Sequence, residues 1–153
     1  MKLYLVRHGQ ALAENQDPLQ HLSEKGNLDA QKAAEFLKKA RIKINIIISS
    51  IKTRAIQTAE IIAAEVCPTC KVEQINGVLP NDSAEAFLES IEFSEKDIML
   101  VGHLPFLSHL TSLLLSGEKN RVKILYSTCS VVCLEQKEGN AWQLIFAINP
   151  DLL

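Results

Sequence analysis

The sequence predicts an α/β fold, a three-layer sandwich in which helices cover both faces of a mainly parallel central sheet. Apolar, β-branched runs alternate with amphipathic helical segments through the first two thirds of the chain. Several of these runs are apolar throughout, which suits strands that are covered on both faces. The last third holds two further β-like runs joined near Gly139-Asn140, and these predict an antiparallel hairpin added to the sheet.

The expected elements follow one another along the chain in a regular order. Ser23 is a residue type that caps helices, and Pro105 is tolerated in a first helical turn. Residues 10–22 are polar and irregular, which predicts a loop. Strands are expected at residues 2–7, 44–49, 72–75, 97–102, 123–126, 130–136 and 142–148. Helices are expected at residues 24–40, 51–66, 84–91 and 105–115.

Length and composition limit the class of protein. With 153 residues, we expect one domain, spanning residues 1–153. The net charge of −2 and the aromatic content of 5% do not favour a nucleic-acid partner. No apolar stretch reaches the ~18 residues of a membrane span, and the N-terminus does not resemble a secretory signal. We therefore expect a cytoplasmic protein that does not contact a membrane, and nothing demands more than a monomer.

The four cysteines are Cys67, Cys70, Cys129 and Cys133. In a cytoplasmic protein the expected state is the free thiol, with cysteine packing as a small apolar residue. The CxxC spacing of Cys67 and Cys70 leaves a local disulfide and half of a zinc site as alternatives.

Three predicted strands end in residues that suit phosphate chemistry. Arg7, His8 and Gly9 follow the first strand, Arg54 comes shortly after the second, and His103 follows the strand at 97–102. The carboxyl ends of parallel strands lie at one edge of a sheet, which is where ligands bind in such folds. A guanidinium group binds phosphate oxygens, and a neutral imidazole can attack phosphorus. The sequence therefore predicts a phosphate site at this edge.

The chain resembles the histidine phosphatase superfamily, whose fold is that of phosphoglycerate mutase. The residues that carry the resemblance are 5–9 (LVRHG), 22–26 (LSEKG), 49–59 (SSIKTRAIQTA) and 101–103 (VGH). Their order and spacing cover essentially the whole chain. The short length and the segment at 102–105 (GHLP) are most similar to the small bacterial protein phosphohistidine phosphatases of the SixA type.

The resemblance implies a role for each matching residue. His8 is expected to be the nucleophile that forms a phosphohistidine intermediate, while Arg7, Arg54 and His103 hold the phosphoryl oxygens. Two roles are open to Ser50, donation to phosphate and capping of the helix that carries Arg54, and capping is favoured. No metal or cofactor is expected. Further contacts with the substrate are expected from Gly9, Gln10, His21 and the backbone N–H of Leu104.

The sequence offers a weak candidate for a general acid, and this bears on the substrate. Larger family members place a Glu or Asp in the segment that corresponds to residues 77–82, where only Asp82 is found, and it is expected to serve a turn or a helix cap. A sugar or serine phosphate needs such an acid to protonate its leaving alkoxide. A phosphohistidine loses an imidazole nitrogen, whose ring titrates near ~6.5 and can arrive already protonated.

We therefore expect a metal-independent phosphatase that removes phosphate from phosphohistidine on a protein, such as an Hpt domain of a phosphorelay. The short loops favour the same substrate, because an open site admits a side chain on a folded protein. The main alternative is a phosphomonoesterase acting on a small phosphorylated metabolite, with Asp82 or Glu85 as the acid. A phosphate-binding module without turnover and a metalloenzyme are less favoured by the sequence.

Overall fold

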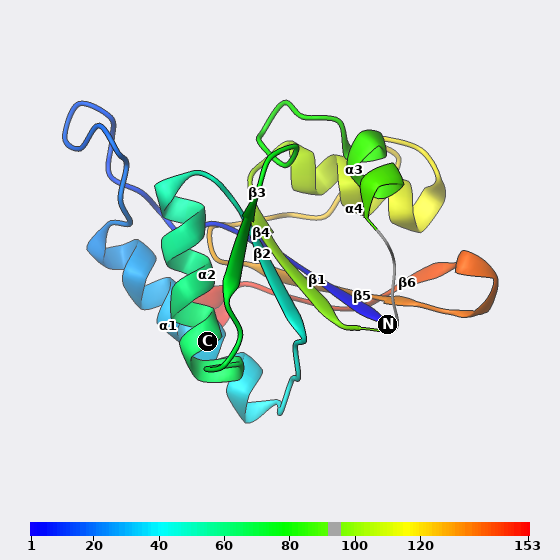
Figure 1. Cartoon of the computed structure of the whole chain (residues 1–153), viewed down its shortest axis with the longest axis horizontal. Coiled ribbons are helices and arrows are strands. Elements are labelled where there is room, and N and C mark those ends of the chain that lie inside the picture. The colour runs from blue at the N-terminus through cyan, green and yellow to red at the C-terminus, as the bar shows by residue number, and fades with distance from the viewer. Residues whose placement is uncertain (92–95) are drawn as a thin grey trace.

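A six-stranded sheet forms the middle layer of the molecule, with its strands in the order β3-β2-β4-β1-β5-β6 (Figure 1). The computed structural model describes residues 1–91 and 96–153. The strands are β1 (Lys2–Arg7), β2 (Ile46–Ser50), β3 (Val72–Ile75), β4 (Ile98–Gly102), β5 (Val131–Gln136) and β6 (Trp142–Ile148).

The first four strands are parallel and the last two are antiparallel. β4 pairs in parallel with both β1 and β2, and β2 pairs in parallel with β3. β5 runs antiparallel to β1 and to β6, and a short turn of 3₁₀-helix, η1 (Glu138–Asn140), connects β5 with β6. The predicted parallel sheet with a C-terminal hairpin is therefore confirmed.

Two pairs of helices cover the two faces of this sheet. The helices are α1 (Glu24–Lys39), α2 (Thr53–Val66), α3 (Ala84–Ser90) and α4 (Phe106–Ser116). Figure 1 shows α1 beside α2 on one face and α3 beside α4 on the other, and contacts within each pair agree with this view. Ser23 caps α1 as predicted, since its hydroxyl accepts the Gly26 N–H. Among the described residues, no helix is long and apolar enough to cross a membrane.

Strand β1 contributes to both cores because its side chains alternate between the two faces. Tyr4 and Val6 belong to the apolar cluster that includes residues of α1 and α2. Leu3 and Leu5 belong to the cluster that includes residues of α3 and α4. All four side chains are almost completely buried. The carboxyl end of β1 is therefore anchored from both sides.

The prediction of a strand at residues 123–126 is wrong. Residues 123–126 run as irregular chain, because both edges of β1 are already occupied by β4 and β5. The carbonyl of Tyr126 accepts a hydrogen bond from the Arg7 side chain, 2.8 Å away, where a strand would use it in a ladder. The Tyr126 hydroxyl lies 2.7 Å from that of Thr111 on α4, which fixes the segment by side-chain contacts.

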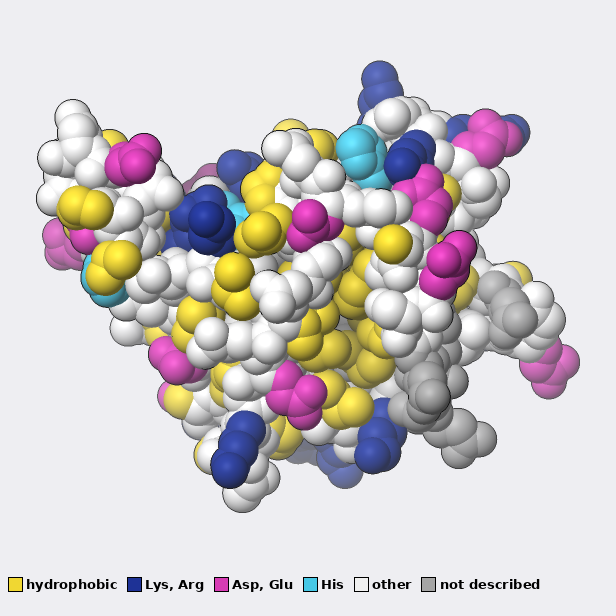
Figure 2. All heavy atoms as spheres, turned by 45° about the horizontal axis from the view of Figure 1, so that its top comes forward, with side chains coloured by type: hydrophobic (Ala, Val, Ile, Leu, Met, Phe, Trp, Pro, Cys, Tyr) yellow, Lys and Arg dark blue, Asp and Glu magenta, His cyan; other side chains and the backbone are white. Residues whose placement is uncertain are grey.

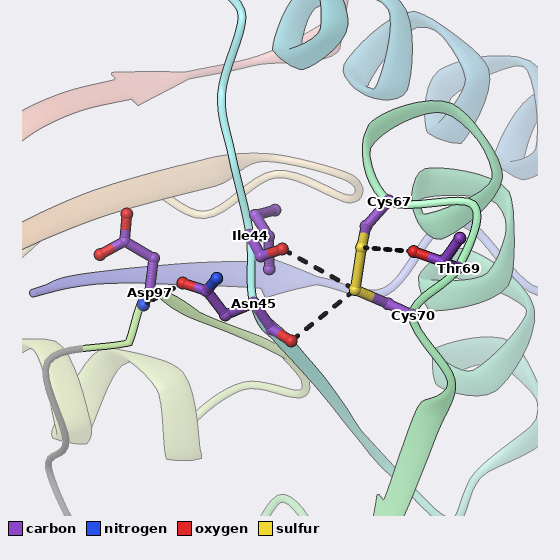
Figure 3. The surroundings of a disulfide bond; sticks show 6 residues. All are labelled: Ile44, Asn45, Cys67, Thr69, Cys70 and Asp97. Carbon is purple, nitrogen blue, oxygen red and sulfur yellow. Dashed lines mark hydrogen bonds between the residues drawn. A yellow bond between two sulfur atoms is a disulfide. The ribbon is translucent and has the colours of Figure 1, made fainter.

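The expectation of four free thiols is wrong for one pair, because Cys67 and Cys70 form a disulfide (Figure 3). The turn after α2 brings their Cα atoms to 5.3 Å, within the ordinary range for this bond. Figure 3 shows the carbonyl groups of Ile44 and Asn45 beside the Cys70 sulfur, at 3.7 Å each. The two other cysteines are free and buried, as expected.

Candidate active site

The carboxyl ends of β1 and β4 lie next to each other and bring two histidines together. Arg7 pairs with Gly102 in the sheet, and the His8 N–H donates to the Gly102 carbonyl at 3.0 Å. The ring centres of His8 and His103 are 4.9 Å apart. Arg54 lies in the first turn of α2, and its Nε is 3.3 Å from His8 Nε2. The four residues predicted to handle phosphate therefore form one site.

This site opens beside a projecting segment of the chain, residues 11–22. Ala11 pairs with Leu22 in an isolated bridge at the base of this segment. Figure 1 shows the segment extending away from the body at the N-terminal end of α1. In Figure 2, basic and histidine side chains meet in the notch between this projection and the rest of the molecule.

The ring of His8 is held with one nitrogen protonated and the other available. Its Nδ1 lies 2.7 Å from the carbonyl of Gly9, so Nδ1 carries the proton and Nε2 keeps its lone pair. Burial lowers the pKa of His8 to about 4, and the nearby charges of Arg54 and Arg7 add to this effect. At neutral pH, Nε2 is an uncharged nucleophile.

The two guanidinium groups supply the positive charge of the site. Arg7 donates from one terminal nitrogen to the Tyr126 carbonyl, and Arg54 donates to the side-chain oxygen of Gln20 at 2.9 Å. Burial lowers the pKa of both arginines, yet an arginine in a protein remains a cation. Within the described residues, neither guanidinium forms an ion pair with a carboxylate.

His103 is buried, with 1% of its surface exposed, and its partner was not foreseen from the sequence. Its Nε2 lies 2.6 Å from the hydroxyl of Ser50, at the end of β2. The expectation that Ser50 caps α2 is wrong, because Lys52 occupies the cap position and Ser50 turns toward His103 instead. Burial, together with the positive charges nearby, lowers the pKa of His103 to about 3, so the ring is neutral.

Two buried nitrogens of this site have no hydrogen-bond partner among the described residues. In the described part of the chain, four buried side-chain atoms lack a hydrogen-bond partner, and two of them are Arg7 Nε and His103 Nδ1. A buried donor without a partner costs about 1–3 kcal/mol, so native proteins keep few of them. Both belong to residues that the sequence assigns to phosphate binding. A phosphoryl oxygen is the kind of acceptor that they lack.

Thr58 connects the strand end to the helix, and it was not singled out from the sequence. Its hydroxyl accepts the Gly9 N–H at 2.9 Å and donates to the Arg54 carbonyl at 2.7 Å. The available signal was the spacing: Thr58 lies four residues after Arg54, so it occupies the same face of α2. Through this contact the position of Gly9, next to His8, is fixed relative to Arg54.

Three residues expected to bind substrate form no hydrogen bond with the central four side chains in the described part of the chain, and their contact with substrate stays a prediction. Gln10 is exposed, and its side-chain oxygen accepts from the Ser23 hydroxyl at 3.0 Å. His21 bonds through Nδ1 to Asp17 at 2.6 Å. Leu104 precedes Pro105 at the start of α4 and is partly buried. Among the hydrogen bonds of residues 1–91 and 96–153, none links these three to the central side chains.

Gln20, the residue before His21, is the one whose side chain contacts Arg54. Its backbone has a φ of +50°, an uncommon left-handed conformation for a residue with a side chain. Asp17 holds this turn, because its backbone carbonyl accepts the Gln20 N–H and its carboxylate accepts the N–H groups of Leu19 and His21. The turn thereby presents the Gln20 side chain to Arg54.

The carboxylates considered as general acids make other contacts. Asp82 accepts the Leu79 N–H at 2.7 Å, which confirms its expected role in a turn. Glu85 pairs with Lys119 at 2.7 Å, and this hydrogen bond is the main reason that its pKa falls to about 2. Across the described residues, no group of three His, Cys, Asp or Glu side chains is placed to hold a metal ion.

Comparison with known proteins agrees with this geometry. Residues 3–76 match the model of the histidine phosphatase superfamily, branch 1. An uncharacterized protein of Picosynechococcus sp. is 35% identical over 128 residues, which cover 77% of this chain and 75% of that protein. The chain belongs to the histidine phosphatase superfamily.

Solved structures show the same histidine phosphatase fold over the whole chain. The protein histidine phosphatase SixA, solved with tungstate, aligns with a TM-score of 0.83 and 21% identity, covering 99% of each chain. A mutant phosphoserine phosphatase of Entamoeba histolytica, solved with phosphoserine, aligns with a TM-score of 0.72 and 18% identity, covering 99% of this chain and 98% of that one. Proteins of this fold therefore include phosphatases with different substrates.

Replacing Gln20 with alanine is expected to weaken phosphate binding. Without the amide oxygen, Arg54 loses the contact that orients its guanidinium, and one hydrogen bond is worth about 0.5–1.5 kcal/mol. We expect KM for a phosphorylated substrate to rise about threefold to tenfold. Gln16→Ala is the matched control, because Gln16 lies on the same projection and, among the hydrogen bonds of the described residues, its side-chain oxygen accepts from the Ala13 N–H and not from Arg54. Equal KM values for the two variants would contradict this role of Gln20.

The lowered pKa of His8 predicts how stability depends on pH. The ring stays neutral in the folded chain down to about pH 4, whereas the unfolded chain takes up the proton near 6.5. The contribution of His8 to the free energy of unfolding should therefore be fully present above pH 6.5 and should be lost as the pH falls from 6.5 to 4. Urea unfolding measures this slope, which His8→Asn should reduce. An identical slope in His8→Asn would show that His8 does not titrate this way.

Proposed function

We propose that this histidine phosphatase removes phosphate from phosphohistidine on a protein, with His8 as the nucleophile and residues 1–153 acting as one catalytic domain. The observation that carries the proposal is a neutral His8 beside two cationic arginines and two buried nitrogens without a hydrogen-bond partner. Such a site suits a phosphoryl group, because phosphoryl transfer depends mainly on positioning and on stabilisation of charge.

In the first step, His8 Nε2 attacks the phosphorus of the substrate. The bond between phosphorus and the substrate nitrogen breaks, and its electron pair returns to that nitrogen. If the substrate ring carries a proton on its other nitrogen, it leaves as neutral imidazole and needs no further acid. The Gly9 carbonyl keeps the proton on His8 Nδ1 and stabilises the positive charge that the phosphorylated ring acquires.

In the second step, water attacks the phosphorylated His8. The bond between phosphorus and Nε2 breaks, the electron pair returns to Nε2, and both water protons remain with the product, dihydrogen phosphate. His8 is thereby restored to its starting state, with the proton still on Nδ1. In both steps Arg7 and Arg54 offset the negative charge of the phosphoryl oxygens.

The surrounding carboxylates favour a phosphohistidine over an alcohol phosphate. An alkoxide leaving group needs a proton donor, and Glu85 is ionised at neutral pH because it is paired with Lys119. Asp82 accepts a backbone N–H in its turn. The likeness to SixA, a protein histidine phosphatase, supports a protein substrate such as an Hpt domain.

A small phosphorylated metabolite is the second candidate substrate. It is supported by the shared fold with a phosphoserine phosphatase solved with phosphoserine. Under this alternative the enzyme would act as a phosphomonoesterase, and a carboxylate in or near the segment between β3 and α3 would have to protonate the alkoxide.

Phosphate release from three substrates distinguishes the two candidates. The substrates are an Hpt domain phosphorylated with phosphoramidate, phosphoserine and p-nitrophenyl phosphate. We expect kcat/KM for the Hpt domain to exceed that for phosphoserine by at least about a hundredfold, because only the serine alkoxide needs the missing acid. The leaving group of p-nitrophenyl phosphate departs without protonation, so this ester reports turnover that does not depend on an acid. His8→Ala should abolish all turnover. Faster hydrolysis of phosphoserine than of the Hpt domain would refute the proposal.

A further inference from the structure

Two neighbouring serines end strand β2, and they have very different surroundings. Ser49 and Ser50 are both completely buried, and successive side chains of a strand point to opposite faces. The hydroxyl of Ser50 lies 2.6 Å from His103 Nε2. The hydroxyl of Ser49 has no hydrogen-bond partner in the described part of the chain. Only one of the two serines therefore contacts the candidate active site.

The contacts of Ser50 indicate which atom carries the proton of its bond to His103. The Lys52 N–H donates to the Ser50 oxygen at 3.4 Å, so this oxygen already accepts one hydrogen bond. In the described part of the chain the hydroxyl has one other hydrogen-bond partner, His103 Nε2, which is therefore the acceptor available for its single proton. A neutral imidazole has one proton, and a ring that accepts at Nε2 must carry this proton on Nδ1.

The opposite arrangement suits a phosphate site poorly. If Nε2 donated to Ser50, then Nδ1 would keep a lone pair. Of the two ring nitrogens, Nδ1 is the one without a partner, and a lone pair there would repel a phosphoryl oxygen. A proton on Nδ1 instead provides a donor that a phosphoryl oxygen can accept.

We propose that Ser50 is a positioning residue that holds His103 as the tautomer with its proton on Nδ1, so that this residue offers a neutral donor to the phosphoryl group. The proposal deepens the proposed function and rests on it for its catalytic consequence. His103 then differs from the two arginines, because it contributes a directed hydrogen bond without adding charge to the empty site. Ser50 acts only through His103.

The ¹⁵N NMR spectrum of the histidine rings tests the tautomer directly. Protonated and unprotonated ring nitrogens have well-separated chemical shifts, so the spectrum reports which nitrogen of neutral His103 carries the proton. In the wild-type protein at pH 7 we expect protonation at Nδ1, and a shift of this signal when inorganic phosphate is added. In Ser50→Ala we expect a mixture of the two tautomers. Ser49→Ala, the matched control, should keep the wild-type pattern.

Kinetics on the phosphorylated Hpt domain test the consequence for catalysis. Misplacement of a catalytic group by about 1 Å can cost about a hundredfold in rate, so we expect kcat/KM to fall about tenfold to a hundredfold in Ser50→Ala. Ser50→Thr keeps the hydroxyl and should recover most of this loss. Ser49→Ala should retain wild-type kcat/KM. Thermal unfolding of each variant identifies any that fails to fold.

Three results would overturn the proposal. The first is wild-type His103 protonated at Nε2. The second is Ser50→Ala with unchanged tautomer and unchanged kcat/KM. The third is a loss of activity in Ser50→Ala without any change in the tautomer. If the wild-type enzyme bound inorganic phosphate with His103 protonated at Nδ1 but did not act on the Hpt domain, the proposed substrate would fail while the tautomer assignment stood.

Discussion

Positive charge without a countercharge is the constraint on which the rest of this site depends. Arg7 and Arg54 are partly buried at the carboxyl edge of the sheet, and in the described part of the chain no carboxylate pairs with them. Their charge helps to keep His8 and His103 neutral. A neutral His8 is a nucleophile, and the same charge attracts the dianionic group that it attacks.

Backbone and side-chain partners then direct each group of the site. The Gly9 carbonyl fixes the proton of His8 on Nδ1, and the Tyr126 carbonyl holds one end of Arg7. The side-chain oxygen of Gln20 holds Arg54, and the hydroxyl of Ser50 holds His103. Such prior orientation lowers the cost of reorganisation when a phosphoryl group binds. The irregular segment around Tyr126 contributes to this orientation, because its carbonyl accepts a hydrogen bond from Arg7 at the end of β1.

The sequence predicted the elements that local patterns determine and missed those that depend on distant contacts. The three strands that precede His8, Arg54 and His103 follow from apolar runs, and their convergence follows from parallel pairing. The partner of Ser50 lies 53 residues away, so local capping preference gave the wrong answer. The contact of Gln20 with Arg54 was missed, because the turn around Asp17 decides which side chain faces Arg54.

The most direct test of the account is to find where the phosphoryl group resides during turnover. The enzyme is mixed with a phosphorylated Hpt domain, quenched in alkali to preserve phosphohistidine, and examined by mass spectrometry and ³¹P NMR. The account predicts phosphate on Nε2 of His8 and none on the His8→Ala variant. Phosphate on another residue would contradict the account. Turnover that proceeds without a phosphorylated enzyme, and that His8→Ala retains, would contradict it as well.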